Sequence, residues 1–463
     1  MSVLPPAGVA FDSDFPVVII GAGAAGLIAA LSVREAGHDV LVIERDSIPR
    51  GSTALSAGLI PAADTSWQRA AGITDSPTQF AADIMAKANG APDADLVALV
   101  TQQVGPTLEW LHASHGLEFS VIADFRYPGH SAFRMHGLPS RSGLELIDRL
   151  RTAAEGAGVE LLCNALVTDI VADSACVRGV IVTRPDGSRE AIGCHALVLA
   201  CNGYGGNTAL VTQHIPDMAG ALYFGHVGNQ GDALAWGAAL GADIRDLSGY
   251  QGHGSVAHPA GILISWATIT EGGVQVNTHG LRFANEAHGY SEAAVPVLRQ
   301  PGAVAWTIFD ARIASIARQF EDFRTAEAAG IILTSDTVDG LAGRIGVPSA
   351  ALSHTLTEAA ALKSAGGTDR FGRSFIGVQQ LQPPYRAVRC TGALFHTQGG
   401  LVVNARARVR RVSGGVIPNL FAAGGAARGV SGPTAAGYLS GNGLLTAVAL
   451  GRVAGQAAAG STR

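Results

Sequence analysis

One stretch near the N-terminus, residues 17–44, constrains the fold of this chain more than any other. It opens with four apolar residues, a run typical of a buried parallel strand. Three glycines in a G-x-G-x-x-G arrangement follow: Gly21, Gly23 and Gly26. A helix is then expected from about residue 24 to 36, and a second apolar strand at 40–43 is ended by Glu44. Strand, glycine turn, helix and strand in this order predict the start of an α/β domain with a parallel sheet.

The chemistry that such a turn supports is dinucleotide binding. The first glycine permits a tight turn, the second lets the backbone approach a pyrophosphate, and the third lets the helix pack on the strand. The N-terminus of the helix offers N–H groups to the phosphates. Glu44 can accept both hydroxyls of an adenosine ribose. The motif alone leaves FAD and NAD open, and a tight turn in some other α/β protein is the alternative interpretation.

Composition excludes several classes of protein. With 463 residues, 48% of them apolar and 15% charged, the chain predicts two or three folded domains rather than disorder. A net charge of −5 without a basic cluster argues against a nucleic-acid partner. The 14 histidines show no ligand spacing, so no metal site is expected. We also expect no signal peptide and no membrane span. Five scattered cysteines suggest reduced thiols and a cytoplasmic location: Cys163, Cys176, Cys194, Cys201 and Cys390.

The pattern along the chain predicts a discontinuous Rossmann-like cofactor-binding domain with an inserted α+β capping domain. The expected borders are residues 1–248 and 396–463 for the cofactor domain and 249–395 for the insert, which we expect to cover the site and exclude water. Helices are expected at about 75–116, 143–155, 348–362 and 443–460. Strands are expected within 159–200, at 401–404 and near 419–422.

Seven motifs follow one another along the chain, and the first is the glycine turn with Glu44. The others are Gly-Ser-Thr-Ala-Leu-Ser-Ala-Gly at 51–58, Ala-Cys-Asn-Gly-Tyr-Gly at 200–205, Gly-Asn-Gln-Gly-Asp at 228–232, Val-Asn-Thr-His-Gly-Leu-Arg-Phe-Ala-Asn-Glu at 276–286, Phe-His-Thr-Gln-Gly-Gly at 395–400 and Ala-Ala-Gly at 422–424. In this order they resemble the motifs of the fumarate reductase/succinate dehydrogenase flavoprotein family, which includes 3-ketosteroid dehydrogenases.

This resemblance implies FAD as the cofactor. Ser52 stands where some members carry a histidine that bonds FAD covalently, so dissociable, non-covalent FAD is expected. Gly425 stands where the family has a glutamate, which puts one ribityl contact in doubt. The residues expected to bind FAD are Gly21, Gly23, Ala24, Ala25, Gly26, Glu44, Arg45, Ser52, Thr53, Ser56, Ala57, Gly58, Val167, Cys201, Asn202, Gly203, Asp232, Gly424, Gly441 and Asn442.

Two tyrosines replace arginines that fumarate reductases use on a dicarboxylate. Tyr290 stands at the position of the proton-donating arginine, and Tyr438 takes the place of the arginine that clamps a carboxylate. The upstream relay glutamate and arginine also lack counterparts in residues 264–270. Because bidentate arginine is the usual carboxylate clamp, a dicarboxylate substrate is disfavoured. Asn-Glu-x-x-x-Tyr at 285–290 instead resembles 3-ketosteroid dehydrogenases, in which this tyrosine is the base.

The chemistry of these tyrosines fits desaturation beside a ketone. A phenolate can take the α-proton if its pKa, near 10 when unperturbed, is lowered, while the β-hydrogen passes to flavin N5. We therefore expect Tyr290 as base and Tyr438 as a contact to the carbonyl or another part of the substrate. The alternative for both is ordinary packing.

Four further residues are candidates through the resemblance. His396 matches the family's substrate-contacting histidine and is expected in the catalytic site. Tyr127 and Arg141 fall in a segment that faces the flavin in relatives, and Arg141 is the remaining candidate for a single carboxylate. His258 resembles the family's His-Pro if a gap is allowed. A structural role is the alternative for each.

The sequence thus predicts an FAD-dependent dehydrogenase that introduces a C=C bond α,β to a ketone. The expected substrate is a cyclic ketone, either a small one of the 4-oxocyclohexanecarboxylate type or a 3-ketosteroid, and the sequence does not identify the electron acceptor. The first alternative is a reductase of an activated alkene that uses the same atoms in reverse. The second is an FAD-binding protein without turnover.

Overall fold

The computed structural model describes residues 1–174 and 176–461, and the chain forms two compact units. The first unit comprises residues 1–216, 225–250 and 396–463, and the second comprises 217–224 and 251–395. The structure thus changes unit at 250/251 and 395/396, and it assigns the short segment 217–224 to the second unit. No helix among the described residues is long and apolar enough to cross a membrane.

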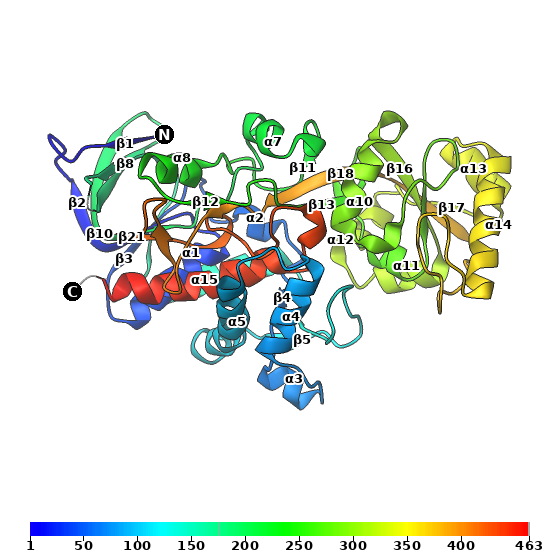
Figure 1. The fold of residues 1–463 in the computed structure, drawn as a ribbon, viewed down its shortest axis with the longest axis horizontal. Helices are drawn as coiled ribbons and strands as arrows, with labels where there is room; N and C mark the ends of the chain where they lie inside the picture. Colours follow the sequence, from blue (N-terminus) through cyan, green and yellow to red (C-terminus); the bar gives the residue numbers. More distant parts are fainter. Residues whose placement is uncertain (175, 462–463) are drawn as a thin grey trace. The chain divides into compact units, whose positions relative to one another are not determined.

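A nine-stranded mixed sheet is the centre of the first unit (Figure 1). Its main path runs in the order β1 (Ser2–Leu4), β8 (Leu166–Ala172), β9 (Val177–Thr183), β10 (Arg189–Leu199), β2 (Ser13–Ile20), β3 (Val40–Ile43) and β7 (Glu160–Leu162). Off this path, β21 (Val416–Ala422) pairs with β10 and with β20 (Arg408–Arg410). Strands β21, β10, β2, β3 and β7 are parallel, whereas β8, β9 and β10 form an antiparallel meander. The carboxyl ends of the parallel strands therefore open at one edge, where ligands bind in such folds.

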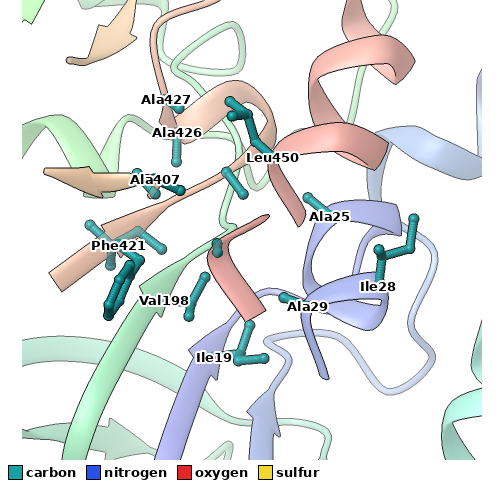
Figure 2. Packing of buried hydrophobic residues seen from close by; sticks show 14 of the residues in the cluster. Ile19, Ala25, Ile28, Ala29, Val198, Ala407, Phe421, Ala426, Ala427 and Leu450 are labelled. Carbon is teal, nitrogen blue, oxygen red and sulfur yellow. The ribbon is translucent and has the colours of Figure 1, made fainter. Parts of the chain in front are cut away.

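Two helices rich in small residues cover the parallel strands. Helix α1 (Ala24–Glu35) packs along α15 (Asn442–Ala459) (Figure 2). The close approach depends on glycines in α15, because a Cβ on Gly451 would lie 2.6 Å from the Ala25 carbonyl oxygen. Ile19, Val198 and Phe421 from three neighbouring strands are fully buried in the same core. This packing fixes the N-terminus of α1 over the carboxyl end of β2.

The other helices of the first unit are α2 (Gly51–Ala54), α3 (Ser66–Ala70), α4 (Pro77–Lys87), α5 (Ala94–His115), α6 (Gly143–Gly156), α7 (Thr208–His214) and α8 (Asp232–Ala239). Small sheets join β4 (Ile60–Pro61), β6 (Met135–Gly137) and β5 (Ser120–Val121), and pair β12 (Ile244–Arg245) with β19 (Gly400–Leu401).

The region expected to be helical, 75–116, forms two helices, α4 and α5, separated by a turn. The break follows from residues 89–92, where Asn89 and Gly90 have positive φ angles and Pro92 cannot continue a helix. Asp93 then caps α5 by accepting from the amides of residues 95 and 96. The strand expected at 401–404 is interrupted: Gly400–Leu401 forms β19, and Val403 makes an isolated antiparallel bridge to Val409.

A seven-stranded sheet organises the second unit. Its order is β14 (Ile262–Leu263), β13 (Tyr250–Ala257), β18 (Tyr385–Thr397), β16 (Val304–Asp310) and β15 (Val274–Val276), and β11 (Leu222–Tyr223) and β17 (Leu333–Ser335) also pair with β18. Its helices are α9 (Ala267–Thr270), α10 (Tyr290–Leu298), α11 (Ala311–Ala317), α12 (Glu321–Ala328), α13 (Val338–Ile345) and α14 (Ser349–Ala365). One apolar core includes residues of α11 and α12, and another includes residues of α13 and α14.

Candidate functional site

Two of the three glycines in the turn between β2 and α1 have a steric reason within the fold. Gly21 has a φ of +101°, and a Cβ there would lie 2.6 Å from the Ala200 carbonyl oxygen. A Cβ on Gly26 would overlap the carbonyl oxygen of Gly21. Gly23 differs, because among the described residues only the Thr53 hydroxyl oxygen lies within 4 Å of its Cβ position, at 3.6 Å. The fold itself requires glycine at 21 and 26, whereas the open space at 23 is what a backbone approached by a ligand has.

The N-terminus of α1 and Glu44 form a cradle beside this turn. Gly23 is the N-cap and offers the helix no side-chain acceptor, and the Ala24 amide donates to the Thr53 hydroxyl at 3.1 Å. Glu44 is buried at the end of β3, and its carboxylate accepts from the Ala22 amide at 2.9 Å. Helix N-terminal amides bind phosphate, and an acidic residue at this strand end binds a ribose. These residues therefore fit a dinucleotide with its pyrophosphate at the turn.

Arg45 links two of the predicted cofactor segments. Its guanidinium lies 3.7 Å from the Asp232 carboxylate, at the start of α8, and donates to the Gly228 carbonyl. Burial raises the pKa of Asp232, and the positive charge of Arg45 opposes that rise. The segment after β3 and the 228–232 motif therefore meet in the first unit.

Ser52 is held by the loop that precedes α8. Its hydroxyl accepts from the backbone amide of His226 at 3.1 Å and from the side-chain amide of Asn229 at 2.9 Å. The His226 imidazole lies 2.7 Å from the Asp46 carboxylate. His226 and Asn229 were not among the predicted site residues, although Asn229 lies in the motif at 228–232. A serine has no imidazole nitrogen to bond a flavin, which agrees with the expected dissociable cofactor.

Asn202 departs from the family pattern Ala-Thr-Gly-Gly-Phe, which has glycine at this position. This departure fits the one at Gly425. Asn202 has a φ of +64°, and its side-chain oxygen accepts from the Gly203 amide at 2.9 Å. A Cβ on Gly425 would overlap that same oxygen. The asparagine side chain thus takes space that a larger residue at 425 would need. Next to it, burial raises the pKa of Cys201 to about 12, so this residue stays a thiol.

The segment that includes Ser56, Ala57 and Gly58 packs against the start of α6. Gly58 has a φ of +65°, and a Cβ there would lie 2.5 Å from the Ser142 carbonyl oxygen. This contact brings the neighbouring Arg141 to the same region. The Arg141 guanidinium faces the Asp124 carboxylate at 3.6 Å, and a substrate carboxylate would have to share this charge.

Tyr127 packs on an apolar cluster in the same unit: Leu59, Ile122 and Met135. Burial raises the pKa of Tyr127 to about 12, so it stays a phenol. Gly441 lies beside this cluster, because a Cβ there would be 3.4 Å from the Met135 methyl carbon. Among the remaining predicted cofactor residues, Gly424 lies against Ala25, with 3.1 Å between its Cβ position and the alanine methyl. Val167 is buried in β8 opposite Val182.

His396 and Tyr438 lie together in the first unit. Their rings meet edge to face with centroids 5.4 Å apart. Both are set by the first turn of α15: a Cβ on Gly443 would lie 2.6 Å from His396 Nε2, and the Tyr438 hydroxyl accepts from the Gly443 amide at 3.4 Å. Burial lowers the pKa of His396 to about 4 and raises the pKa of Tyr438 above its ordinary value. Both groups are therefore neutral near pH 7 and suited to donate hydrogen bonds.

Tyr290 lies at one end of a stack of aromatic rings in the second unit. His253 stacks on Tyr290 with centroids 4.9 Å apart and on Phe395 at 5.1 Å, and Phe395 stacks on Phe224 at 4.7 Å. The Trp266 ring meets the Tyr290 ring edge-on at 6.5 Å. His253, Phe395 and Phe224 were missed by sequence reasoning, because their neighbourhood depends on contacts between distant segments.

Helix α10 holds Tyr290 in this stack. The Ser291 hydroxyl accepts from the Gly252 amide of β13 at 3.0 Å. A Cβ on Gly254 would lie 2.6 Å from the Ala293 methyl carbon, so glycine there lets α10 approach the strand. Tyr290 is also the first residue of α10, where the helix dipole favours negative charge.

His258 is not part of this stack. It follows β13, five residues beyond His253, a separation of about 17 Å along an extended strand. Its side chain is exposed, and its amide donates to the Arg389 carbonyl at 2.9 Å. The structure thus does not bring His258 to Tyr290.

The two arginines of the second unit nearest the 276–286 motif are engaged in a buried ion network. Arg282 lies 2.7 Å from Glu286 and 2.6 Å from Asp369, and Arg373 lies 3.1 Å from Glu286. Burial pushes the pKa of Glu286 upward, but the hydrogen bond from Arg282 and the charges of both arginines lower it overall. These guanidinium groups neutralise internal carboxylates and hold the 282–286 segment.

Fold and cradle together define a dinucleotide-binding α/β protein that carries a second, mixed unit as an insertion. The chain matches the family model described as FAD binding domain over residues 16–444, and it belongs to that family. It is 32% identical to the probable fumarate reductase Ifc3 of Shewanella frigidimarina (strain NCIMB 400), over 96% of this chain and 74% of the relative. It is 24% identical to the 4-oxocyclohexanecarboxylate 2-dehydrogenase of Sinomonas cyclohexanicum, over 97% and 93%.

A solved structure supports the same assignment. The open conformation of a flavocytochrome c3 fumarate reductase is similar with a TM-score of 0.83 and 30% identity, over 98% of this chain and 79% of that one. The predicted fold class and family are confirmed, and FAD, not NAD, is the cofactor. The chain is an FAD-dependent oxidoreductase of a family that acts on CH–CH groups. An FAD-binding protein without turnover is therefore set aside.

Proposed function

We propose that this protein is an FAD-dependent dehydrogenase that introduces a C=C bond beside the carbonyl of a cyclic ketone, with Tyr290 as the base. Tyr290 takes the proton of the carbon next to the carbonyl, and bound FAD supplies the acceptor for the hydride of the following carbon. The observation that carries this proposal is the fixed Tyr290 ring, clamped by His253 at the N-terminus of α10. A phenolate there is favoured by the positive end of the helix.

Neutral donors in the first unit support a ketone substrate. His396 and Tyr438 are uncharged near pH 7 because burial shifts their pKa values away from charged forms. Hydrogen-bond donors of this kind stabilise the negative charge that grows on a carbonyl oxygen as the α-proton leaves. They offer no bidentate cation for a carboxylate.

The arginines also argue against a dicarboxylate. The two positions that carry arginine in the fumarate reductase pattern are Tyr290 and Tyr438. Arg282 and Arg373 are buried against Glu286, so a substrate carboxylate would have to displace an internal one. The Sinomonas relative, a 4-oxocyclohexanecarboxylate 2-dehydrogenase, supports a cyclic oxo compound as substrate. Arg141 would bind the single carboxylate of a 4-oxocyclohexanecarboxylate-type substrate.

The direct test is anaerobic flavin reduction. Purified holoenzyme is mixed with 4-oxocyclohexanecarboxylate or a saturated 3-ketosteroid, and the flavin absorbance is followed. We expect bleaching with wild-type protein. Tyr290→Phe should keep bound FAD and slow bleaching by about 10²–10⁴-fold, the usual loss of a general base. Unchanged bleaching in this variant would overturn the role of Tyr290.

The second candidate is reduction of an activated alkene, favoured by the higher identity, 32%, to a probable fumarate reductase. Chemically reduced holoenzyme is mixed with fumarate or with a cyclic enone under argon. Reoxidation by fumarate would establish the reductase and contradict the ketone proposal. Reoxidation by the enone alone would agree with the same site working in reverse.

A further inference from the structure

A buried chain of polar side chains ends on His396. Gln398 stands where the family pattern His-Thr-Met-Gly-Gly has methionine, and it is 5% exposed. Its amide nitrogen lies 3.0 Å from His396 Nδ1, and its amide oxygen lies 2.6 Å from the Ser431 hydroxyl. The side-chain nitrogen of Asn442 lies 3.0 Å from the same hydroxyl. Ser431 and Asn442 are almost completely buried, at 1% and 0% exposure.

The direction of the hydrogen bonds follows from the donors. The Asn442 amide nitrogen can only donate, so the Ser431 oxygen accepts from it and sends its own proton to the Gln398 oxygen. Gln398 then presents its NH₂ group to His396 Nδ1, which must accept. A neutral imidazole that accepts at Nδ1 carries its proton on Nε2. The Thr397 carbonyl, 3.3 Å from Nδ1, is the longer contact and would be used only in the opposite tautomer.

We propose that the Asn442–Ser431–Gln398 chain locks His396 in the Nε2–H tautomer and makes Gln398 a positioning residue. His396 is then a hydrogen-bond donor and not a base at Nε2. The consequence for turnover rests on the proposed function, because the Nε2–H would bind the ketone oxygen as it becomes an enolate oxygen. The tautomer itself does not depend on the substrate.

Two features around His396 agree with this role. Only glycine at 443 leaves Nε2 uncovered, since a Cβ there would lie 2.6 Å from that nitrogen. The Asn442 side-chain oxygen is buried and has no hydrogen-bond partner among the described residues, and Asn442 is a predicted FAD contact. The Asn442 side-chain oxygen can accept a hydrogen bond from a donor on the cofactor. Such a bond would fix the orientation of the Asn442 amide and therefore the direction of the hydrogen bonds through Ser431 and Gln398.

The test reads the tautomer directly. Holoenzyme labelled with ¹⁵N-histidine is studied by NMR, in which protonated and unprotonated ring nitrogens have distinct shifts, and the His396 signals are assigned by their loss in His396→Phe. Wild-type protein should show a protonated Nε2. Gln398→Glu should reverse the tautomer, because a carboxylate accepts from Nδ1–H. Gln398→Met and Ser431→Ala should give mixed tautomers.

Turnover separates this inference from the proposed function. Gln398→Glu should retain FAD and slow flavin bleaching by ketone at least about tenfold, as expected for a lost oxyanion donor. The matched control is Gln380→Glu, the same change at an exposed glutamine that also contacts a serine, and it should alter neither the His396 signals nor the rate. Protonated Nδ1 in wild-type protein, or an unchanged tautomer in Gln398→Glu, would overturn the inference. A tautomer that responds as expected in an enzyme inert toward ketones would instead overturn the proposed function alone.

Discussion

The two units of this protein encode their candidate site residues in different ways. In the first unit, the residues of the cradle come from short motifs, and glycines at 21 and 26 have steric causes within the turn and its neighbouring strand. In the second unit, the ring of Tyr290 is placed by His253, and the stack continues to Phe395 and Phe224. The cofactor-binding turn can therefore be predicted from a short stretch of sequence. The aromatic stack cannot, because its residues are far apart in the sequence and meet only in the folded unit.

We expect the largest effect on FAD binding and stability from substitutions in the glycine turn. Two variants test whether the requirement for glycine is set by contacts within the turn and its neighbouring strand. Gly26→Ala should lose bound FAD and lower the free energy of unfolding by about 1–3 kcal/mol or more, because its methyl group overlaps the Gly21 carbonyl. Gly23→Ala should leave the apoprotein within about 1 kcal/mol of wild type, since its Cβ has room. Flavin content and urea unfolding of the apoproteins measure both effects. Equal destabilisation by the two substitutions would contradict the distinction.

The second unit should be most sensitive at its buried ion network. Arg373→Met removes donors to Glu286 and to the Gly273 carbonyl, which is 2.9 Å away. Breaking a buried pair costs about 3–5 kcal/mol, because the remaining groups lose their partner. Arg370→Met, the same change at an exposed position three residues earlier, should stay within about 0.5 kcal/mol. Urea unfolding of the holoenzyme measures this difference, and similar midpoints for the two variants would show that the network is dispensable.

These contrasts explain what the sequence could predict. β3 was expected at 40–43 and is Val40–Ile43, and α14 and α15 began within a residue or two of their expected starts, because periodicity and glycine signals are local. The helical expectation for 75–116 was wrong in its middle, because the apolar period that supported it begins only at Leu96, beyond the turn at Asn89 and Gly90. His253 gave no signal, since its partners lie on other elements. Gln398 did give one, as a polar residue at a methionine position, but its partners Ser431 and Asn442 required the fold.

Acid should affect the two units unequally. Burial lowers the pKa of His130 and His136 in the first unit to about 4, and of His253 in the second to about 3. The unfolded chain takes up these protons near pH 6.5 while the folded protein does not, so stability falls as pH drops below 6.5. Each such histidine costs about 2 kcal/mol between pH 6.5 and 5.

A single substitution isolates one of these contributions. His136→Gln should lower stability at pH 7 but remove about 2 kcal/mol of the loss between pH 6.5 and 5. His354→Gln, at an exposed position of the second unit, should leave the loss of stability between pH 6.5 and 5 unchanged. Hydrogen exchange followed by peptide mass analysis at both pH values assigns the loss to a unit. If the stability of His136→Gln falls with pH as steeply as that of wild type, the burial of a neutral imidazole at this position is contradicted.

The smallest effect we expect is the energetic coupling between Asn202 and Gly425. This coupling would show that the first unit also contains a site feature that depends on tertiary contacts. Each residue departs from the family pattern inside a recognisable motif, yet the reason is tertiary: a Cβ at 425 overlaps the Asn202 side-chain oxygen. Gly425→Glu alone should therefore weaken FAD binding, and adding Asn202→Gly should recover about 1–2 kcal/mol, within the range for residues in contact. Flavin fluorescence titration of the four proteins gives this coupling energy. If the two changes are additive, the departures arose independently; if they couple, even the locally encoded unit contains a site feature that a motif cannot reveal.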